Sequence, residues 1–319
     1  MTQTDNFHRV RDMARMVQQS VGRVIVGKEA VIDLLMVALL CEGHVLFEDV
    51  PGIGKTTMAK ALARSLGCSF QRIQFTPDLL PSDVTGITFY NQKNGEFEFR
   101  PGPILSQIVL ADEINRATPR TQSALLEAME ERQVSVERET LVLPRPFIVV
   151  ATQNPVELEG TFPLPEAQLD RFLMRLRLDY PSKSEERLIL QRFKEAQPLQ
   201  DVAPVIDARQ LEQMQVLIRK VHVEPVVESY IVDLVRATRT HSGVELGVSP
   251  RGSLALYRSS QAYAALQGRN YVIPDDVKRL ARPVLAHRMI ATSQARLHGR
   301  LMDQVIDDVL QTIAVPVES

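Results

Sequence analysis

The sequence contains little cysteine and little net charge. Among its 319 residues there are two cysteines, Cys41 and Cys68, which are too few for a disulfide framework or a cysteine-based metal cluster. We therefore interpret both as small packed hydrophobic side chains. The formal net charge of -2 gives no general attraction to nucleic acid or to acidic membranes.

The sequence also lacks a long hydrophobic run. The longest apolar stretch, residues 31–41, is interrupted by Asp33 and is shorter than the roughly 20 residues that span a bilayer. The first residues lack the apolar segment of a signal peptide. We therefore expect a cytoplasmic protein without direct membrane insertion. The length suggests about two globular domains.

Short apolar segments alternate with helical patterns in the first half of the chain. The segments that predict strands are 44–48, 72–75, 107–111, 147–152 and 173–178. Most are continuously apolar, as is typical of strands covered on both faces. One helical pattern, 118–132, has Pro119 in its first turn. The alternation predicts an α/β fold with a parallel five-stranded sheet and helices on both sides.

The pattern changes in three other places. Residues 85–100 and 133–144 predict β-hairpins, the first with an Asn94-Gly95 turn and the second with its tip at 137–139. After residue 181 the pattern is helical, and we expect Pro283 to break one helix. We therefore divide the chain into an α/β domain with an N-terminal helical segment, residues 1–181, and an all-helical domain, residues 182–319.

A glycine-rich loop lies between the strand at 44–48 and a helical pattern that begins at Thr56. This order is the context of a nucleoside triphosphate site, because glycines let the backbone aim its N–H groups at phosphates. Lys55 would reach the β- and γ-phosphates of ATP, and the Thr56 hydroxyl would bind Mg²⁺. The candidate nucleotide-binding residues are Pro51, Gly52, Ile53, Gly54, Lys55, Thr56 and Thr57.

Asp49 departs from the usual pattern of this loop, which has glycine at that position. Pro51-Gly52 can supply the tight turn instead. A carboxylate close to phosphates is electrostatically unfavourable. We therefore expect the Asp49 side chain to point away from the nucleotide.

The strand at 107–111 leads into two acidic residues, Asp112 and Glu113. Asp112 suits a Mg²⁺ role, and Glu113 suits polarising the attacking water. The alternative is a helix-capping aspartate followed by a solvated glutamate. The phosphate loop upstream favours the catalytic interpretation.

Several motifs resemble the MoxR family of AAA+ ATPases, and the resemblance extends from about residue 26 to residue 284. The matching runs are Ala111–Ala117, Thr121–Glu131, Ala151–Pro155, Pro165–Phe172 and Gly247–Arg251. They are more similar to MoxR proteins than to the magnesium chelatase, replicative helicase or enhancer-binding branches. The resemblance implies an AAA+ P-loop NTPase core followed by a C-terminal helical lid.

The resemblance also implies roles for single residues. Asn154 would be the sensor 1 residue that holds the attacking water, although an asparagine before Pro155 is also typical of a turn. Arg171 would be the arginine finger for the neighbouring subunit's ATP, with Arg116 and Arg120 as rivals.

Two further positions complete the expected site. Arg251 would be the sensor 2 residue, at the start of a lid helix, and would act on its own or on an adjacent nucleotide. Val26 and Gly27 would line the adenine, and their alternative is simple packing and a turn.

The resemblance implies a chaperone-like ATP hydrolase that drives remodelling, maturation or metal-cofactor insertion of a client protein. A homo-oligomeric ring, expected to be a hexamer, would turn its two hairpins towards the pore or a partner. A von Willebrand factor A domain protein would be a separate chain, because the DxSxS-type signature is absent here. The alternatives are a DNA-remodelling AAA+ motor, disfavoured by the pI of about 6.3, and a nucleotide-gated binding module with little turnover.

Overall fold

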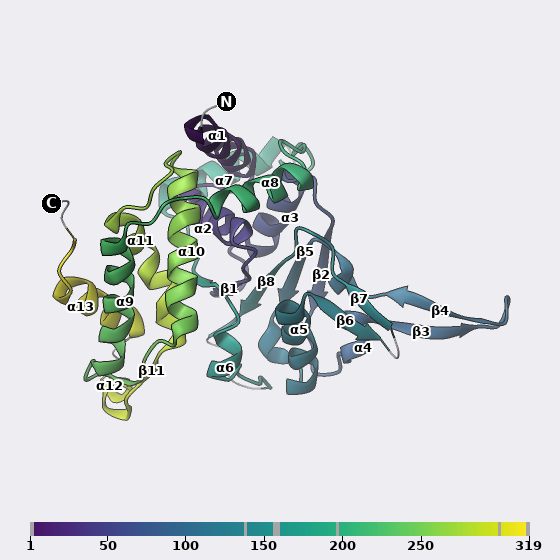
Figure 1. Cartoon of the computed structure of the whole chain (residues 1–319). Helices are drawn as coiled ribbons and strands as arrows, with labels where there is room; N and C mark the ends of the chain where they lie inside the picture. Colours follow the sequence, from purple (N-terminus) through teal and green to yellow (C-terminus); the bar gives the residue numbers. More distant parts are fainter. Residues whose placement is uncertain (1–2, 137–138, 156–159, 196–197, 299–300, 317–319) are drawn as a thin grey trace.

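A parallel sheet forms the centre of the first half of the chain (Figure 1). The computed structural model describes residues 3–136, 139–155, 160–195, 198–298 and 301–316. The five strands lie in the order β2-β5-β8-β1-β9 and all pairs are parallel, as predicted. They are β1 (Val45–Glu48), β2 (Phe70–Gln74), β5 (Ile108–Asp112), β8 (Ile148–Gln153) and β9 (Met174–Leu176).

Helices cover both faces of this sheet. Val45 and Phe47 of β1 belong to one apolar core together with α2 and α3, whereas Leu46 belongs to a second core with α5. Side chains of a strand alternate between faces, so each strand supplies both cores. The elements of this half are α1 (Gln3–Gly22), α2 (Glu29–Leu40), α3 (Lys55–Ser65), α4 (Pro81–Thr85), η1 (Pro103–Leu105), η2 (Ile114–Arg116), α5 (Pro119–Glu131) and α6 (Glu166–Leu169).

Both predicted hairpins are present. The strands β3 (Gly86–Asn91) and β4 (Glu96–Pro101) form a ribbon that projects from the body of the molecule (Figure 1). The second hairpin consists of β6 (Gln133–Val136) and β7 (Glu139–Val142). Its tip was expected at residues 137–139. Glu139 begins β7, and the other two residues lie outside the described part of the chain.

The second half is helical, as predicted, and packs beside the sheet (Figure 1). It also contains a short antiparallel pair, β10 (Val244–Leu246) with β11 (Ile290–Ala291), which the helical patterns did not predict. The helices are α7 (Lys183–Glu195), α8 (Ala208–Ile218), α9 (Pro225–Thr240), α10 (Pro250–Leu266), α11 (Pro274–Leu285), η3 (Ala286–Arg288), α12 (Ser293–Leu297) and α13 (Met302–Thr312). None of the helices in the described ranges combines the length and apolarity needed to cross a bilayer.

The expected break at Pro283 is wrong. Pro283 lies inside α11, which continues to Leu285 before the 3₁₀ turn η3 begins. The missing N–H of Pro283 removes one hydrogen bond of the helix, and α11 ends two residues later rather than at the proline.

The helical half shares its apolar core with the α/β half. One cluster of buried side chains joins α1, α2, α3 and one face of the sheet to α8, α9, α10, α11 and α13. The division between residues 181 and 182 stays a prediction.

Two buried histidines connect separate elements. His44, which precedes β1, accepts a hydrogen bond at Nδ1 from the Val149 N–H (2.9 Å), and its Nε2 lies 3.1 Å from the Met129 carbonyl oxygen. Burial lowers the pKa of His44 to about 3. His287 Nε2 lies 3.0 Å from the Phe172 carbonyl oxygen, and burial lowers the pKa of His287 as well. Both imidazoles are therefore neutral in the folded protein near neutral pH.

We predict that mild acid destabilises the fold through these histidines. Below their ordinary pKa of 6.5 they gain protons in the unfolded chain but not in the folded one. Each histidine then lowers the free energy of unfolding by up to about 1.4 kcal/mol for each unit by which the pH falls. The urea concentration at the unfolding midpoint should decrease when the pH is lowered from about 7.5 to about 5.5. This decrease should be smaller in His44→Gln. An equal fall in the two proteins would contradict the assignment of a neutral His44.

Candidate nucleotide site

The phosphate loop joins the end of β1 at Glu48 to the start of α3 at Lys55. Gly52 and Gly54 have φ values of 85° and 97°, in the left-handed region that side chains disfavour. No atom lies within 4 Å of the position that a Cβ would take at either glycine. The loop is therefore open on this side, and the N-terminus of α3 favours an anion there.

Asp49 points away from the open side of the loop, as expected. It is buried, and its Oδ2 accepts a hydrogen bond of 2.5 Å from the N–H of Leu178, just beyond β9. Burial raises the pKa of Asp49, and the backbone N–H donors oppose this rise. The residue that replaces the usual glycine thus ties the loop to the chain just beyond the neighbouring edge strand, β9.

Lys55 folds back onto the beginning of the loop. Its Nζ donates hydrogen bonds to the carbonyl oxygens of Asp49 (2.8 Å) and Val50 (3.2 Å). Burial lowers the pKa of Lys55, and nearby carboxylates such as Asp112 and Glu113 counteract this effect. The loop therefore holds the Lys55 ammonium group in place at the site where a triphosphate would bind.

A cavity of about 330 Å³ brings the predicted phosphate-binding and acidic residues together. The carboxyl ends of parallel strands meet at one edge of a sheet, which places the ends of β1, β5 and β8 beside each other. The cavity is lined by Pro51, Gly52, Gly54, Lys55, Thr56, Thr57, Arg72, Asp112, Glu113, Thr152 and Asn154.

Thr152 holds both acidic residues in position. Its buried hydroxyl donates to Asp112 Oδ1 (2.6 Å) and accepts from the Glu113 N–H (2.8 Å). On the other side, Arg72 donates to Asp112 Oδ2 from Nε (3.0 Å) and Nη2 (2.6 Å). Gln74 Nε2 donates to Glu113 Oε2 (2.8 Å).

The motifs did not identify Thr152, Arg72 and Gln74. Gln74 and Thr152 lie near the C-terminal ends of β2 and β8, and Arg72 lies in the middle of β2. Their signal is a polar side chain in a strand of the sheet. That signal identifies a site only when the order of the strands is known.

The residues in this cavity fit Mg²⁺·ATP. Mg²⁺ commonly takes one or two protein oxygens and completes its shell with phosphates and water. The Asp112 carboxylate and the Thr56 hydroxyl can supply these oxygens. In the described part of the chain, no group of three or more His, Cys, Asp or Glu residues could hold a metal ion. The donor set is thus suited to a metal that is bound together with phosphate.

A second cavity, of about 340 Å³, adjoins the phosphate loop and suits a planar base. Val26 and Ile53 line it, as do the apolar side chains of Tyr180, Ile189 and Phe193, which sequence analysis missed. Gly27 is not among its lining residues. A Cβ at Gly27 would lie 1.6 Å from Glu185 Oε1, so this glycine permits close packing instead.

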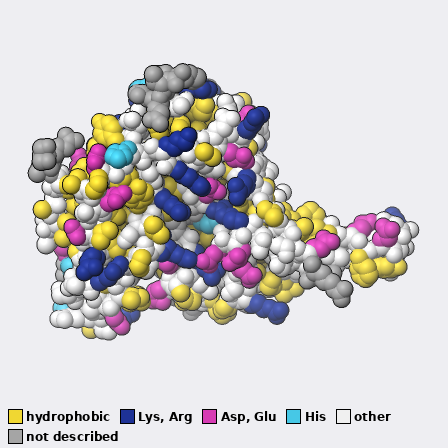
Figure 2. Space-filling model, in the orientation of Figure 1, with side chains coloured by type: hydrophobic (Ala, Val, Ile, Leu, Met, Phe, Trp, Pro, Cys, Tyr) yellow, Lys and Arg dark blue, Asp and Glu magenta, His cyan; other side chains and the backbone are white. Residues whose placement is uncertain are grey.

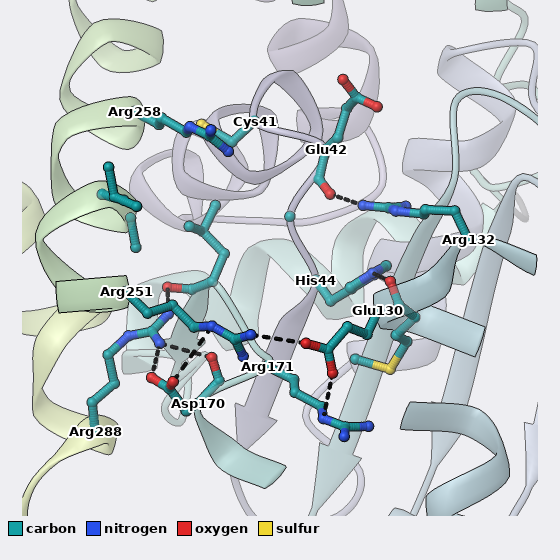
Figure 3. Close-up of a pocket in the computed structure, with 15 residues that line it drawn as sticks. Cys41, Glu42, His44, Glu130, Arg132, Asp170, Arg171, Arg251, Arg258 and Arg288 are labelled. Carbon is teal, nitrogen blue, oxygen red and sulfur yellow. Dashed lines mark hydrogen bonds and ion pairs between the residues drawn. The ribbon is translucent and has the colours of Figure 1, made fainter. Parts of the chain in front are cut away.

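Arg171 and Arg251 lie in a third cavity, of about 360 Å³, and do not line the phosphate-loop cavity of their own chain (Figure 3). Glu130 joins them: its Oε2 is 3.1 Å from Arg171 Nε and its Oε1 is 2.8 Å from Arg251 Nη2. Arg116, in contrast, pairs with Glu113 of its own site (3.2 Å), and Arg120 is exposed at the start of α5.

The third cavity is rich in arginine. Arg132, Arg258 and Arg288 line it as well, and Arg288 pairs with Asp170 next to Arg171 (Figure 3). Lys and Arg side chains also gather over the middle of the molecular face that Figure 2 shows. This arrangement favours binding of an anionic group.

Comparisons with known proteins agree with this geometry. Residues 44–174 match the ATPase family associated with various cellular activities (AAA), and residues 236–313 match an AAA lid domain. Chaperone MoxR1 of Mycobacterium tuberculosis is 43% identical over 93% of this chain and 80% of its own. The chain belongs to the MoxR family of AAA+ ATPases. The family assignment confirms the resemblance inferred from the motifs.

Two further proteins are similar to nearly the whole chain. The YeaC protein of Bacillus subtilis is 53% identical, and the match covers 94% of both chains. The crystal structure of a Cytophaga hutchinsonii protein is 39% identical, with a TM-score of 0.92 and 98% of both chains covered. The predicted AAA+ core with a C-terminal helical lid is thus confirmed.

We predict that Thr152→Val destabilises the protein and slows ATP turnover, because Thr152 holds Asp112 and Glu113 in position. Valine has the same shape but leaves the Glu113 N–H and Asp112 Oδ1 without the hydroxyl, at a cost of about 1–3 kcal/mol. Urea unfolding should show this loss, and ATP turnover should fall with it. Thr152→Ser is the matched control and should keep both properties, because serine retains the hydroxyl. Equal stability of the valine and serine variants would contradict the bridging role.

Proposed function

We propose that this MoxR-family protein hydrolyses Mg²⁺·ATP and uses the turnover for chaperone-like remodelling of a client protein. The observation that carries the proposal is the gathering of Lys55, Thr56, Asp112, Glu113 and Asn154 around one cavity. The name of its relative, chaperone MoxR1, supports the remodelling role. The function extends to maturation or metal-cofactor insertion of the client.

Each residue of the cavity has a distinct task in the proposed reaction. Lys55 binds the β- and γ-phosphates, and Thr56 with Asp112 holds Mg²⁺, which offsets phosphate charge when bound. Glu113 accepts the proton of the attacking water, while the Asn154 amide orients that water. The second cavity, which Val26 and Ile53 line, receives the adenine. Holding these groups in fixed positions supplies much of the rate, because phosphoryl transfer depends on positioning and electrostatics.

We propose that Arg171 and Arg251 act on the nucleotide of an adjoining subunit. Both lie outside their own phosphate-loop cavity, and their side chains are 30% and 50% exposed. A guanidinium held by a carboxylate at an exposed position can transfer to a phosphate of another chain. This arrangement supports a homo-oligomeric ring, for which we propose a hexamer.

The projecting hairpin supports a protein client rather than DNA. Tyr90 and Phe97 lie against each other near its turn, with ring centroids 5.3 Å apart and ring planes tilted by 60°, and both are more than half exposed. Lys93 and Arg100 of this hairpin are balanced by acidic side chains on β4, whereas DNA-gripping loops are rich in basic residues. We propose that the partner is a separate von Willebrand factor A domain protein and that both proteins work in the cytoplasm.

We predict that Glu113→Gln retains ATP but turns it over about 10²–10⁴ times more slowly. Glutamine keeps the size of the side chain and cannot accept the proton of the water. Phosphate release and binding of a fluorescent ATP analogue measure the two effects separately. Lys55→Ala is the control for lost binding. Unchanged turnover in Glu113→Gln would remove this residue from the proposed reaction.

We also predict that two inactive variants restore activity when mixed. Arg171→Ala keeps its phosphate-loop cavity and lacks the finger, whereas Lys55→Ala lacks phosphate binding and keeps Arg171. A mixed ring then completes the site of the first variant with the arginine of the second, and ATP turnover should recover. The control mixture, Lys55→Ala with Glu113→Gln, has every site disabled and should stay inactive. Absence of recovery in the first mixture would mean that Arg171 does not act between subunits.

A further inference from the structure

Arg72 of β2 lines the phosphate-loop cavity, and the proposed reaction gives it no task. Both of its hydrogen bonds to Asp112, from Nε at 3.0 Å and from Nη2 at 2.6 Å, go to the same oxygen, Oδ2. The side chain of Asp112 is 12% exposed and that of Arg72 is 45% exposed. The carboxylate is therefore enclosed by the protein, while the guanidinium is open to solvent and also donates from Nη2 to Oε1 of the exposed Gln74 (2.5 Å).

The two oxygens of Asp112 have different partners. Oδ1 accepts the hydroxyl of Thr152 at 2.6 Å, which is a neutral donor from the adjacent strand. Oδ2 has the cationic partner. A carboxylate this far from solvent is costly without a cation or several donors, and Arg72 meets that need in the nucleotide-free protein.

Mg²⁺ and Arg72 compete for the same oxygen. Mg²⁺ requires close oxygen ligands at about 2.0–2.1 Å in nearly octahedral geometry. An oxygen that already accepts two N–H donors from a guanidinium cannot also meet that geometry. Mg²⁺ can therefore bind this oxygen of Asp112 only when the Arg72 guanidinium has moved away from it.

We propose that Arg72 occupies the cation position on Asp112 in the nucleotide-free protein and is displaced when Mg²⁺·ATP binds. The inference rests on the proposed function, because it takes Asp112 as a ligand of the metal. The displaced guanidinium can be received by solvent, because the Arg72 side chain is already 45% exposed.

Three variants distinguish competition between Arg72 and Mg²⁺ from a purely structural role of Arg72. Arg72→Met removes the charge and keeps an extended side chain, whereas Arg72→Lys keeps a cation that can still compete. Arg236→Met is the matched control, because Arg236 is exposed on α9 and is not among the residues lining the phosphate-loop cavity. Thermal unfolding of each protein records any loss of stability.

The experiment titrates Mg²⁺ at a fixed concentration of a fluorescent, slowly hydrolysed ATP analogue and measures the midpoint for metal-dependent binding. We expect the Mg²⁺ midpoint of Arg72→Met to be about fivefold lower than that of the natural protein, since a half-exposed ion pair no longer opposes the metal. Arg72→Lys should shift less, and Arg236→Met should not shift. A destabilised site would raise the midpoint, so a structural role predicts the opposite sign.

An unchanged or raised midpoint in Arg72→Met, with normal Mg²⁺-dependent binding by the natural protein, overturns the inference and leaves the proposed function intact. Failure of the natural protein to bind the analogue at any Mg²⁺ concentration overturns both.

Discussion

The parallel alignment of β1, β5 and β8 is the constraint on which the nucleotide site depends. These strands end at one edge of the sheet, so the phosphate loop, the acidic pair and Asn154 become neighbours although many residues separate them in the chain. Each strand buries side chains on both of its faces, in two separate apolar cores. A slip of one residue would exchange the two faces, so core packing holds the register and thereby the position of each site residue.

Local patterns were sufficient to predict the strands of the parallel sheet, the two hairpins and the phosphate loop, because each depends on residues that are close in sequence. The contacts of Arg72 and Thr152 with Asp112 depend instead on which strands are neighbours in the sheet, here β2, β5 and β8, and local patterns do not determine that. The same limit applies to Arg171 and Arg251, which meet at Glu130 through tertiary packing. The motifs suggested that both arginines take part, and the structure shows that a single carboxylate joins them.

Asp49 illustrates how a departure from a motif can be explained by a distant contact. A glycine at this position would give the loop flexibility, whereas the carboxylate binds the backbone of Leu178 beyond β9. The strand order makes this contact possible, since β9 pairs directly with β1. The phosphate loop is consequently fastened to the segment of chain that leads into the helical lid.

The charge of the third cavity has a consequence for cohesion between subunits. Five arginines line it, Arg132, Arg171, Arg251, Arg258 and Arg288, against three carboxylates, Glu42, Glu130 and Asp170. In the proposed ring, this excess of positive charge would face the nucleotide of the adjoining chain, and the phosphates would neutralise part of it. Loss of the terminal phosphate would remove part of that negative charge. In such a ring, the stability of each subunit interface would depend on whether the nucleotide bound there is ATP or ADP.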